Sequence, residues 1–242
     1  MIEFHNNEFE RDIRKQLNRT DEPVYEQDLL GITELDCTNY NFDDRDIDIL
    51  RRMYNLKSLD ICIWNHDLEF LKDLSRLEVL GLVYGNREDR LDFELFSGFI
   101  RLKELYVSGG MISGIAYDNL DALIGLTELK TLQLHEFGTV DLSPLRQMPG
   151  LEDFYCGYAN SVTDIDAVGT LRKLKSLTLI DIEMDNLNFL NNLSDDLYLE
   201  LCADNIMEAI DWDSFNRFRE VDICEMKVNG EEINRELLRR DK

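Results

Sequence analysis

The sequence lacks the features that would place it in a membrane or give it a disulfide framework. Over 242 residues, no apolar run approaches the roughly 18 residues that a membrane span needs. The N-terminal stretch MIEFHNNEFERDIRK has no apolar core of a secretory signal. The five cysteines are irregularly spaced, and none shows the paired cysteine and histidine spacing of a zinc site. We therefore expect no disulfide, no metal or other cofactor, and a reducing cytoplasm.

Basic residues are scarce as well. The chain has 26 Lys and Arg against 50 Asp and Glu, which gives a formal net charge of −24. A net charge of magnitude about 2–8 is enough to keep a small domain soluble, so the excess calls for another explanation. Such a charge argues against nucleic acid and anionic membranes as partners and favours a basic protein.

What the sequence does contain is a repeated unit, best seen in the stretch DLEFLKDLSRLEVLGL at residues 67–82. Its first part has one leucine every three residues, which predicts a helical or 3₁₀ turn with a single apolar stripe. Its last part alternates, so Leu80 and Leu82 point inward from a short strand while Val79, Gly81 and Val83 point outward. One such unit cannot bury its apolar face alone, so it must stack on copies of itself.

Nine stretches of the chain fit this unit. Their equivalent inward strand positions are predicted to be Leu35, Leu59, Leu80, Leu105, Leu132, Phe154, Leu177, Leu197 and Val221. The steps between them run from 20 to 27 residues, within the 20–29 residues of leucine-rich repeats. We therefore predict one domain over residues 1–242, in which residues 24–225 form about nine repeats with one continuous core.

Each end of the repeat array is predicted to carry a helical cap. Phe9, Ile13 and Leu17 lie four residues apart and predict an amphipathic helix within an N-terminal cap at residues 1–23. The dipeptide Asn229-Gly230 predicts a turn. A helix over 231–240 should follow it and complete a C-terminal cap at residues 226–242.

On these motifs the chain resembles bacterial leucine-rich repeat proteins of the internalin-like type. The resemblance implies an α/β fold: a curved, right-handed solenoid with a parallel sheet on its concave face and short helical or 3₁₀ turns on its convex side. Such proteins usually bind other proteins. One departure is that the asparagine typical of the family after each strand is mostly replaced, for example by Tyr40, Trp64 and Phe137. A continuous asparagine ladder is therefore not expected.

The outward strand positions on the concave face are the candidate site. Parallel strands in register would bring Asp36 beside Asp60, and Asp196 beside Glu220, at roughly 5 Å. Like charges side by side destabilise a sheet, so their presence suggests a surface kept for a basic partner. The predicted partner-binding residues are Asp36, Asp60, Tyr106, Gln133, His135, Asp153, Tyr155, Tyr198, Glu200 and Asp222.

The 27 outward strand positions of the nine units contain no Lys or Arg. Basic residues are present nearby, because Lys57, Lys103, Lys130 and Lys175 each come one position earlier, where we expect the edge of the sheet. Tyr106, Tyr155 and Tyr198 are predicted on alternate strands, about 10 Å apart.

No constellation for catalysis is apparent. His135 is predicted on the same side of the sheet as Cys62 and Cys224, but it lies several strands from both, more than about 10 Å away. A cysteine–histidine nucleophile needs hydrogen-bond contact. We therefore interpret His135 as an exposed contact residue. Cys37 and Cys156 fill inward strand positions as small apolar residues.

These observations favour a non-catalytic protein–protein interaction module, monomeric when unbound, that binds a basic protein as an inhibitor or a toxin-immunity protein. The alternative is an adaptor, a scaffold or a surface adhesin that uses its loops or convex side. The adhesin would need a signal or anchor that we do not find in the sequence. An enzymatic role comes third.

Overall fold

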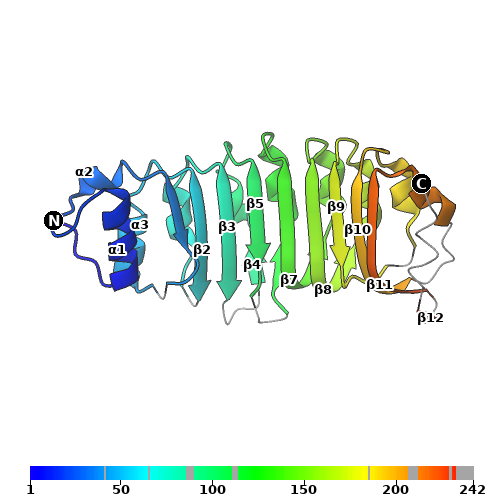
Figure 1. Ribbon diagram of the computed structural model, residues 1–242, viewed down its shortest axis with the longest axis horizontal. Coiled ribbons are helices and arrows are strands. Elements are labelled where there is room, and N and C mark those ends of the chain that lie inside the picture. Colours follow the sequence, from blue (N-terminus) through cyan, green and yellow to red (C-terminus); the bar gives the residue numbers. More distant parts are fainter. Residues whose placement is uncertain are drawn as a thin grey trace.

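The computed structural model describes residues 1–40, 42–64, 66–85, 90–110, 114–184, 186–206, 212–228 and 231–232, the backbone alone at 203–205, 212–214, 224–228 and 231–232. In these residues the chain coils into one open parallel sheet with short helices on one of its faces (Figure 1). Nine strands follow one another in chain order across the sheet. They are β1 (Glu34–Cys37), β2 (Ser58–Trp64), β3 (Val79–Gly85), β5 (Glu104–Ser108), β7 (Thr131–Asp141), β8 (Asp153–Thr163), β9 (Ser176–Ile180), β10 (Tyr198–Ile206) and β11 (Glu220–Val228). The predicted solenoid is confirmed.

The predicted stripes of one apolar residue in three form short 3₁₀ helices behind the sheet. In the unit at residues 67–82, the four leucines of the stripe have relative exposures of at most 6%, and Leu80 and Leu82 continue the same core. The 3₁₀ helices are η1 (Glu69–Asp73), η2 (Phe93–Phe96), η3 (Leu120–Gly125), η4 (Ser143–Gln147), η5 (Ile165–Thr170), η6 (Asn188–Asn192) and η7 (Trp212–Arg217). Burial of the stripe, more than helix propensity, holds such short helices in place.

The strands are in register through their inward side chains. Leu80, Leu105, Leu132, Phe154 and Leu177 stand side by side on consecutive strands, and all are fully buried. Where the family asparagine is missing, Tyr40, Phe137 and Ile182 are buried and fill the same end of the core with apolar groups.

The register of the eighth unit differs from the prediction. Leu199, not Leu197, pairs with Leu177 on one side and with Val221 on the other. The segment around it alternates Leu197, Leu199 and Leu201, and all three are buried, so the apolar pattern alone fits two alignments. The structure adopts the one that makes both steps 22 residues, from 177 to 199 and from 199 to 221.

The predicted N-terminal helix is present as α1 (Asn7–Gln16), which lies at the N-terminal end of the sheet (Figure 1). The Asn6 side chain accepts hydrogen bonds from the first backbone N–H groups of α1, and Phe9 and Ile13 are buried. The Phe9 ring contacts Phe42 edge to face at 5.3 Å between centroids. Two more helices, α2 (Glu26–Leu29) and α3 (Asp44–Leu50), flank the first repeat.

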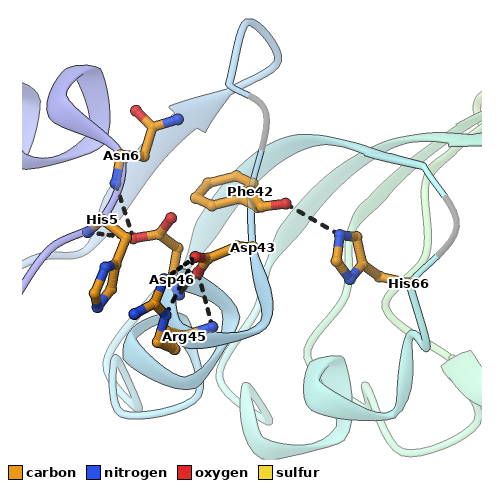
Figure 2. A network of polar contacts seen from close by, with 7 residues as sticks. All are labelled: His5, Asn6, Phe42, Asp43, Arg45, Asp46 and His66. Atoms are coloured by element: carbon orange, nitrogen blue, oxygen red, sulfur yellow. Dashed lines mark hydrogen bonds and ion pairs between the residues drawn. The ribbon is translucent and has the colours of Figure 1, made fainter.

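A buried carboxylate ties the N-terminal segment to α3 (Figure 2). Asp46, only 1% exposed, accepts hydrogen bonds from the backbone N–H groups of His5 (3.0 Å) and Asn6 (3.2 Å). Asp43 caps α3, accepting from the backbone N–H groups of Arg45 and Asp46. On the next unit, His66 Nε2 lies 3.0 Å from the Phe42 carbonyl oxygen. Because burial without partners would cost an acid heavily, this network explains how Asp46 is accommodated in the core.

Three short strands were not predicted from the repeat. β4 (Arg90–Asp92) pairs with β6 (Ala116–Asp118), which in turn pairs with β7 through Val140. β12 (Glu231–Glu232) pairs antiparallel with the end of β11. The rest of the predicted C-terminal turn and helix, at 229–230 and 233–242, lies outside the described residues. The division into caps and repeats stays a prediction.

The cysteines correct one expectation. Cys37, Cys62 and Cys156 are free, and Cys37 and Cys156 fill the core as predicted, but Cys202 is disulfide-bonded. The spacing along the sequence gave no sign of this bond, and the case for a reducing compartment therefore loses its basis. Of the helices in the described ranges, none has the length and apolar character to cross a membrane.

Candidate binding face

The side of the sheet away from the 3₁₀ helices is called here the open face, and it corresponds to the predicted concave face. Its middle row of outward residues crosses all nine strands in register: Asp36, Asp60, Gly81, Tyr106, Gln133, Tyr155, Thr178, Glu200 and Asp222. Eight of the ten predicted site residues therefore lie in the rows in which they were predicted. Glu200 lies one row away, in the middle row.

Tyr198 is the tenth, and the shifted register of β10 moves it as well. It pairs with Ser176 and with Glu220, one row toward the start of the strands. The predicted contact of Asp196 with Glu220 is therefore wrong, because Tyr198 occupies that position. Tyr106, Tyr155 and Tyr198 still lie on alternate strands, as predicted.

The acidic pair Asp36 and Asp60 is confirmed, because these residues face each other across β1 and β2. Burial, with the negative charge of Asp36 added to it, raises the pKa of the Asp60 carboxyl above its ordinary value. Burial also raises the pKa of Asp153, although hydrogen bonds from Gln133 and Ser176 work in the opposite direction. Both acids are therefore held at a cost to the free protein.

The lysines that precede the strands form ion pairs along the edge of the sheet. Lys57 and Lys103 both contact Glu78, at 3.7 Å and 2.6 Å between nitrogen and oxygen. Lys130 and Lys175 contact Glu152 in the same way. These cations are neutralised at the edge, and the middle row contains no Lys or Arg. The negative charges of the open face thus have no basic neighbours within their own row.

His135 is half-buried, which corrects its interpretation as an exposed residue. Its ring stacks on Tyr155 with 3.9 Å between centroids, and its Nε2 lies 3.2 Å from Gln133 Oε1. Burial lowers the pKa of His135, so the ring is held in its neutral form. The Tyr155 ring leans over Gly157, where a Cβ atom would stand 2.7 Å from the Tyr155 hydroxyl oxygen. Because Gly157 has no side chain, the Tyr155 ring has room to stack on His135.

A hollow of about 390 Å³ lies over Gly81, between the acidic side of the face and this aromatic pair. Its lining combines two carboxylates with apolar and aromatic groups, and includes Asp60, Gly81, Val83, Tyr106, His135, Glu136 and Tyr158. The hollow exists because Gly81 contributes no side chain to a row in which its neighbours are Asp60 and Tyr106.

Sequence reasoning missed two aromatic residues of the open face, of which Tyr158 lines this hollow. Trp64, 39% exposed, lies across Gly85, where a Cβ atom would stand 2.0 Å from its ring. Tyr158, 51% exposed, lies within β8 just after the pairing with β9 ends at Gly157, and has a φ of 58°. Both residues lie beyond the three outward positions of each repeat unit from which the binding face was predicted. The available signal was the glycine paired with Trp64, since Gly85 ends β3 as Trp64 ends β2.

Among the side chains that the structure describes, Cys62 and His135 are too far apart in the sheet to form a nucleophilic pair. Cys62 lies on β2 and His135 on β7, with β3 and β5 between them. Burial raises the pKa of the Cys156 thiol far above its ordinary value, which keeps it protonated. In the described part of the chain, no three His, Cys, Asp or Glu side chains are grouped to hold a metal ion.

The parallel sheet, the 3₁₀ helices and the 21- to 27-residue period together define a leucine-rich repeat solenoid. Its architecture is similar to that of internalin C2 from Listeria monocytogenes, with 20% identity and a TM-score of 0.69 over 91% of this chain and 94% of that one. A second internalin of that species, inlF, gives 20% identity and a TM-score of 0.65 over 93% of this chain and 64% of its own. The chain thus has the internalin-like type of repeat fold.

A more distant likeness is to TLR13 in a complex with ssRNA13, with 18% identity and a TM-score of 0.51. It covers 85% of this chain but only 34% of TLR13, and it concerns the fold alone. No protein-family model matches the sequence, and no curated protein sequence matches it significantly.

Proposed function

We propose that this protein is a non-catalytic binding module whose open face binds a basic protein. The observation that carries the proposal is the adjacent pair of acids on that face, in a row that contains no basic residue. Asp36 and Asp60 stand side by side, the middle row has no Lys or Arg, and the nearest lysines are engaged by Glu78 and Glu152. A sheet that keeps like charges adjacent is less stable for it, and a cationic partner relieves the repulsion.

The face has the size and composition of a protein interface. Its 27 outward strand positions match the roughly 20–30 residues that one side of an ordinary interface uses. Tyrosine and tryptophan are enriched where binding energy concentrates. Tyr106, Tyr155, Tyr198 and the added Trp64 supply such anchors among the acids. We propose that the free protein is a monomer and that binding inhibits the partner, as an inhibitor or immunity protein does.

Quantitative capture from native lysate with matched variants tests this proposal. One variant replaces four acids of the open face, Asp36, Asp60, Asp153 and Asp222, with asparagine. A control variant removes four charges from the helical side, through Asp48→Asn, Glu69→Gln, Glu94→Gln and Asp121→Asn, all at exposed positions.

We expect basic proteins to be retained by the wild type and by the control variant and lost by the open-face variant. The retained proteins should also elute as salt is raised, because exposed charges are screened. Equal retention by both variants would contradict the proposal. Selective loss by the control variant would instead favour the adaptor or adhesin that uses the convex side.

A further inference from the structure

The hollow over Gly81 joins an unpaired acid to a set of aromatic and apolar walls. Asp60 is half-buried, and within the described residues it has no cationic partner and no hydrogen-bond donor. Its Oδ1 would stand 2.1 Å from a Cβ atom on Gly81, so the carboxylate lies over the glycine at the floor of the hollow. Glu136 adds a second carboxylate, which accepts a hydrogen bond of 2.9 Å from Ser108.

The aromatic walls of the hollow are Tyr106, His135 and Tyr158. The Tyr106 hydroxyl donates to Glu104 at 2.6 Å, which leaves the ring of Tyr106 as its contribution to the hollow. His135 is fixed by its stacking on Tyr155. Tyr158, half-exposed, lines the side nearer to β8. An occupant must therefore be cationic at one end and must tolerate apolar and aromatic contacts along its length.

We infer that this hollow receives one arginine side chain of the protein partner, with the guanidinium on the Asp60 carboxylate and against the aromatic walls. This deepens the proposed function and rests on it. A guanidinium is planar, stacks on aromatic faces and donates two parallel hydrogen bonds to a carboxylate. Lysine fits less well, because its compact ammonium is strongly hydrated and would have to give up water in a half-buried site.

Titration with a short peptide isolates this interaction from the rest of the interface. The probe is N-acetyl-Gly-Arg-Gly amide, followed by backbone amide NMR of the full chain. The comparison peptides carry citrulline, which has the shape of arginine without its charge, or lysine. We expect saturable shifts at Gly81, Val83, Ser108 and His135 with the arginine peptide. A millimolar dissociation constant is what a ligand of so few atoms can supply.

Two variants with the same charge change make the test specific. Asp60→Asn keeps the size of the side chain and should weaken the peptide roughly tenfold, since a hydrogen-bonded charge pair is worth about that factor. Asp48→Asn removes one charge at an exposed position of α3, on the helical side, and should change the dissociation constant less than about twofold, because only screened attraction acts from there.

Equal shifts with the citrulline or lysine peptide would overturn the arginine assignment. So would a dissociation constant for the arginine peptide that is unchanged by Asp60→Asn. So would the absence of any saturable shift. In each of these cases the capture experiment with the open-face variant still decides the broader proposal. Loss of basic partners in that experiment together with a failed peptide titration would leave the face as the interface and remove the hollow as its arginine site.

Discussion

Gly81 faces Asp60 across β2 and β3, and a Cβ atom built on Gly81 would stand 2.1 Å from Asp60 Oδ1. The carboxylate thus occupies space that only a glycine leaves open. Gly81 has no positive φ, so its backbone conformation does not itself require a glycine. Gly81 leaves space for the Asp60 carboxylate because it has no side chain. Any larger residue at position 81 must displace this carboxylate toward Asp36 or away from the sheet.

Gly81→Ala should therefore destabilise the protein by about 1–2 kcal/mol, the cost of modest overpacking. The measurement is the free energy of unfolding in urea. Gly125→Ala is the matched control, because no atom lies within 4 Å of its Cβ position, and we expect a change within about 0.5 kcal/mol. In the double variant with Asp60→Ala the cost at Gly81 should largely disappear. Additive effects would show that the two residues do not touch.

Asp60→Asn should raise the melting temperature at pH 7 by about 1–3 °C, because it removes a buried charge next to Asp36. The folded-state pKa of Asp60 is raised by burial and then by Asp36, so the folded protein binds a proton more readily than the unfolded chain does. The ionised group therefore destabilises the fold above its folded pKa, and this penalty fades as pH falls toward the ordinary value of 3.8.

The gain in melting temperature should accordingly shrink as pH falls through this range. Differential scanning calorimetry from neutral to acidic pH follows it. Asp48→Asn, exposed on α3, serves as the control and should show no such gain. A lower melting temperature for Asp60→Asn at pH 7 would mean that the carboxylate has a stabilising partner.

Leu132→Ala should cost about 2–5 kcal/mol in urea denaturation, because Leu132 is fully buried between Leu105 and Phe154 and leaves a cavity. Thr131→Ala, at the adjacent half-buried outward position, is the control, with an expected change of about 1 kcal/mol or less. A small loss at Leu132 would contradict the stacked core.

Reduction should lower the melting temperature, because the disulfide at Cys202 constrains the unfolded chain. Native disulfides commonly contribute about 2–4 kcal/mol, which corresponds to several degrees for a chain of this size. Cys202→Ser should melt at the lower temperature with or without reductant. Cys62→Ser, which changes a free thiol, should keep the full response to reductant. No response in the wild type would show that the bond does not contribute.

The sequence was informative wherever the repeat is regular. Spacing alone located the core leucines, the strand order and most of the middle row, because each side chain's face follows from its place in the unit. It failed in the eighth unit, where Leu197, Leu199 and Leu201 are all apolar and two registers satisfy the pattern equally. Pairing with both neighbouring strands decides between them, and no single unit contains that information.

Parts of the site were out of reach for a different reason. The hollow and the position of Trp64 depend on glycines in neighbouring strands, Gly81 and Gly85, so each is a property of two units together. The disulfide at Cys202 likewise has no signature in sequence spacing. The repeat pattern predicts the residues that every unit shares. The candidate site depends on residues that differ from this pattern, so the pattern alone does not predict it.

Once a partner is identified, Tyr155→Ala and Asp36→Lys should weaken binding in different ways. The Tyr155 ring stacks on His135 and lies over Gly157, so its conformation is already fixed before a partner binds. Its removal should cost about 2 kcal/mol or more and mainly speed dissociation. Asp36 is exposed at the edge strand β1 and contributes to the field that draws a cation in. Asp36→Lys should mainly slow association, and its effect should shrink as added salt shortens the screening length.

Surface plasmon resonance across a salt series separates the two effects. Asp48→Lys, with the same charge reversal on the helical side, controls for net charge and should slow association much less. Because long-range steering depends on where the charge lies, equal slowing by Asp36→Lys and Asp48→Lys would mean that the partner senses the whole molecule and not the open face. If Tyr155→Ala leaves dissociation unchanged, the partner does not contact the stacked pair, and the aromatic anchors must be assigned elsewhere on the solenoid.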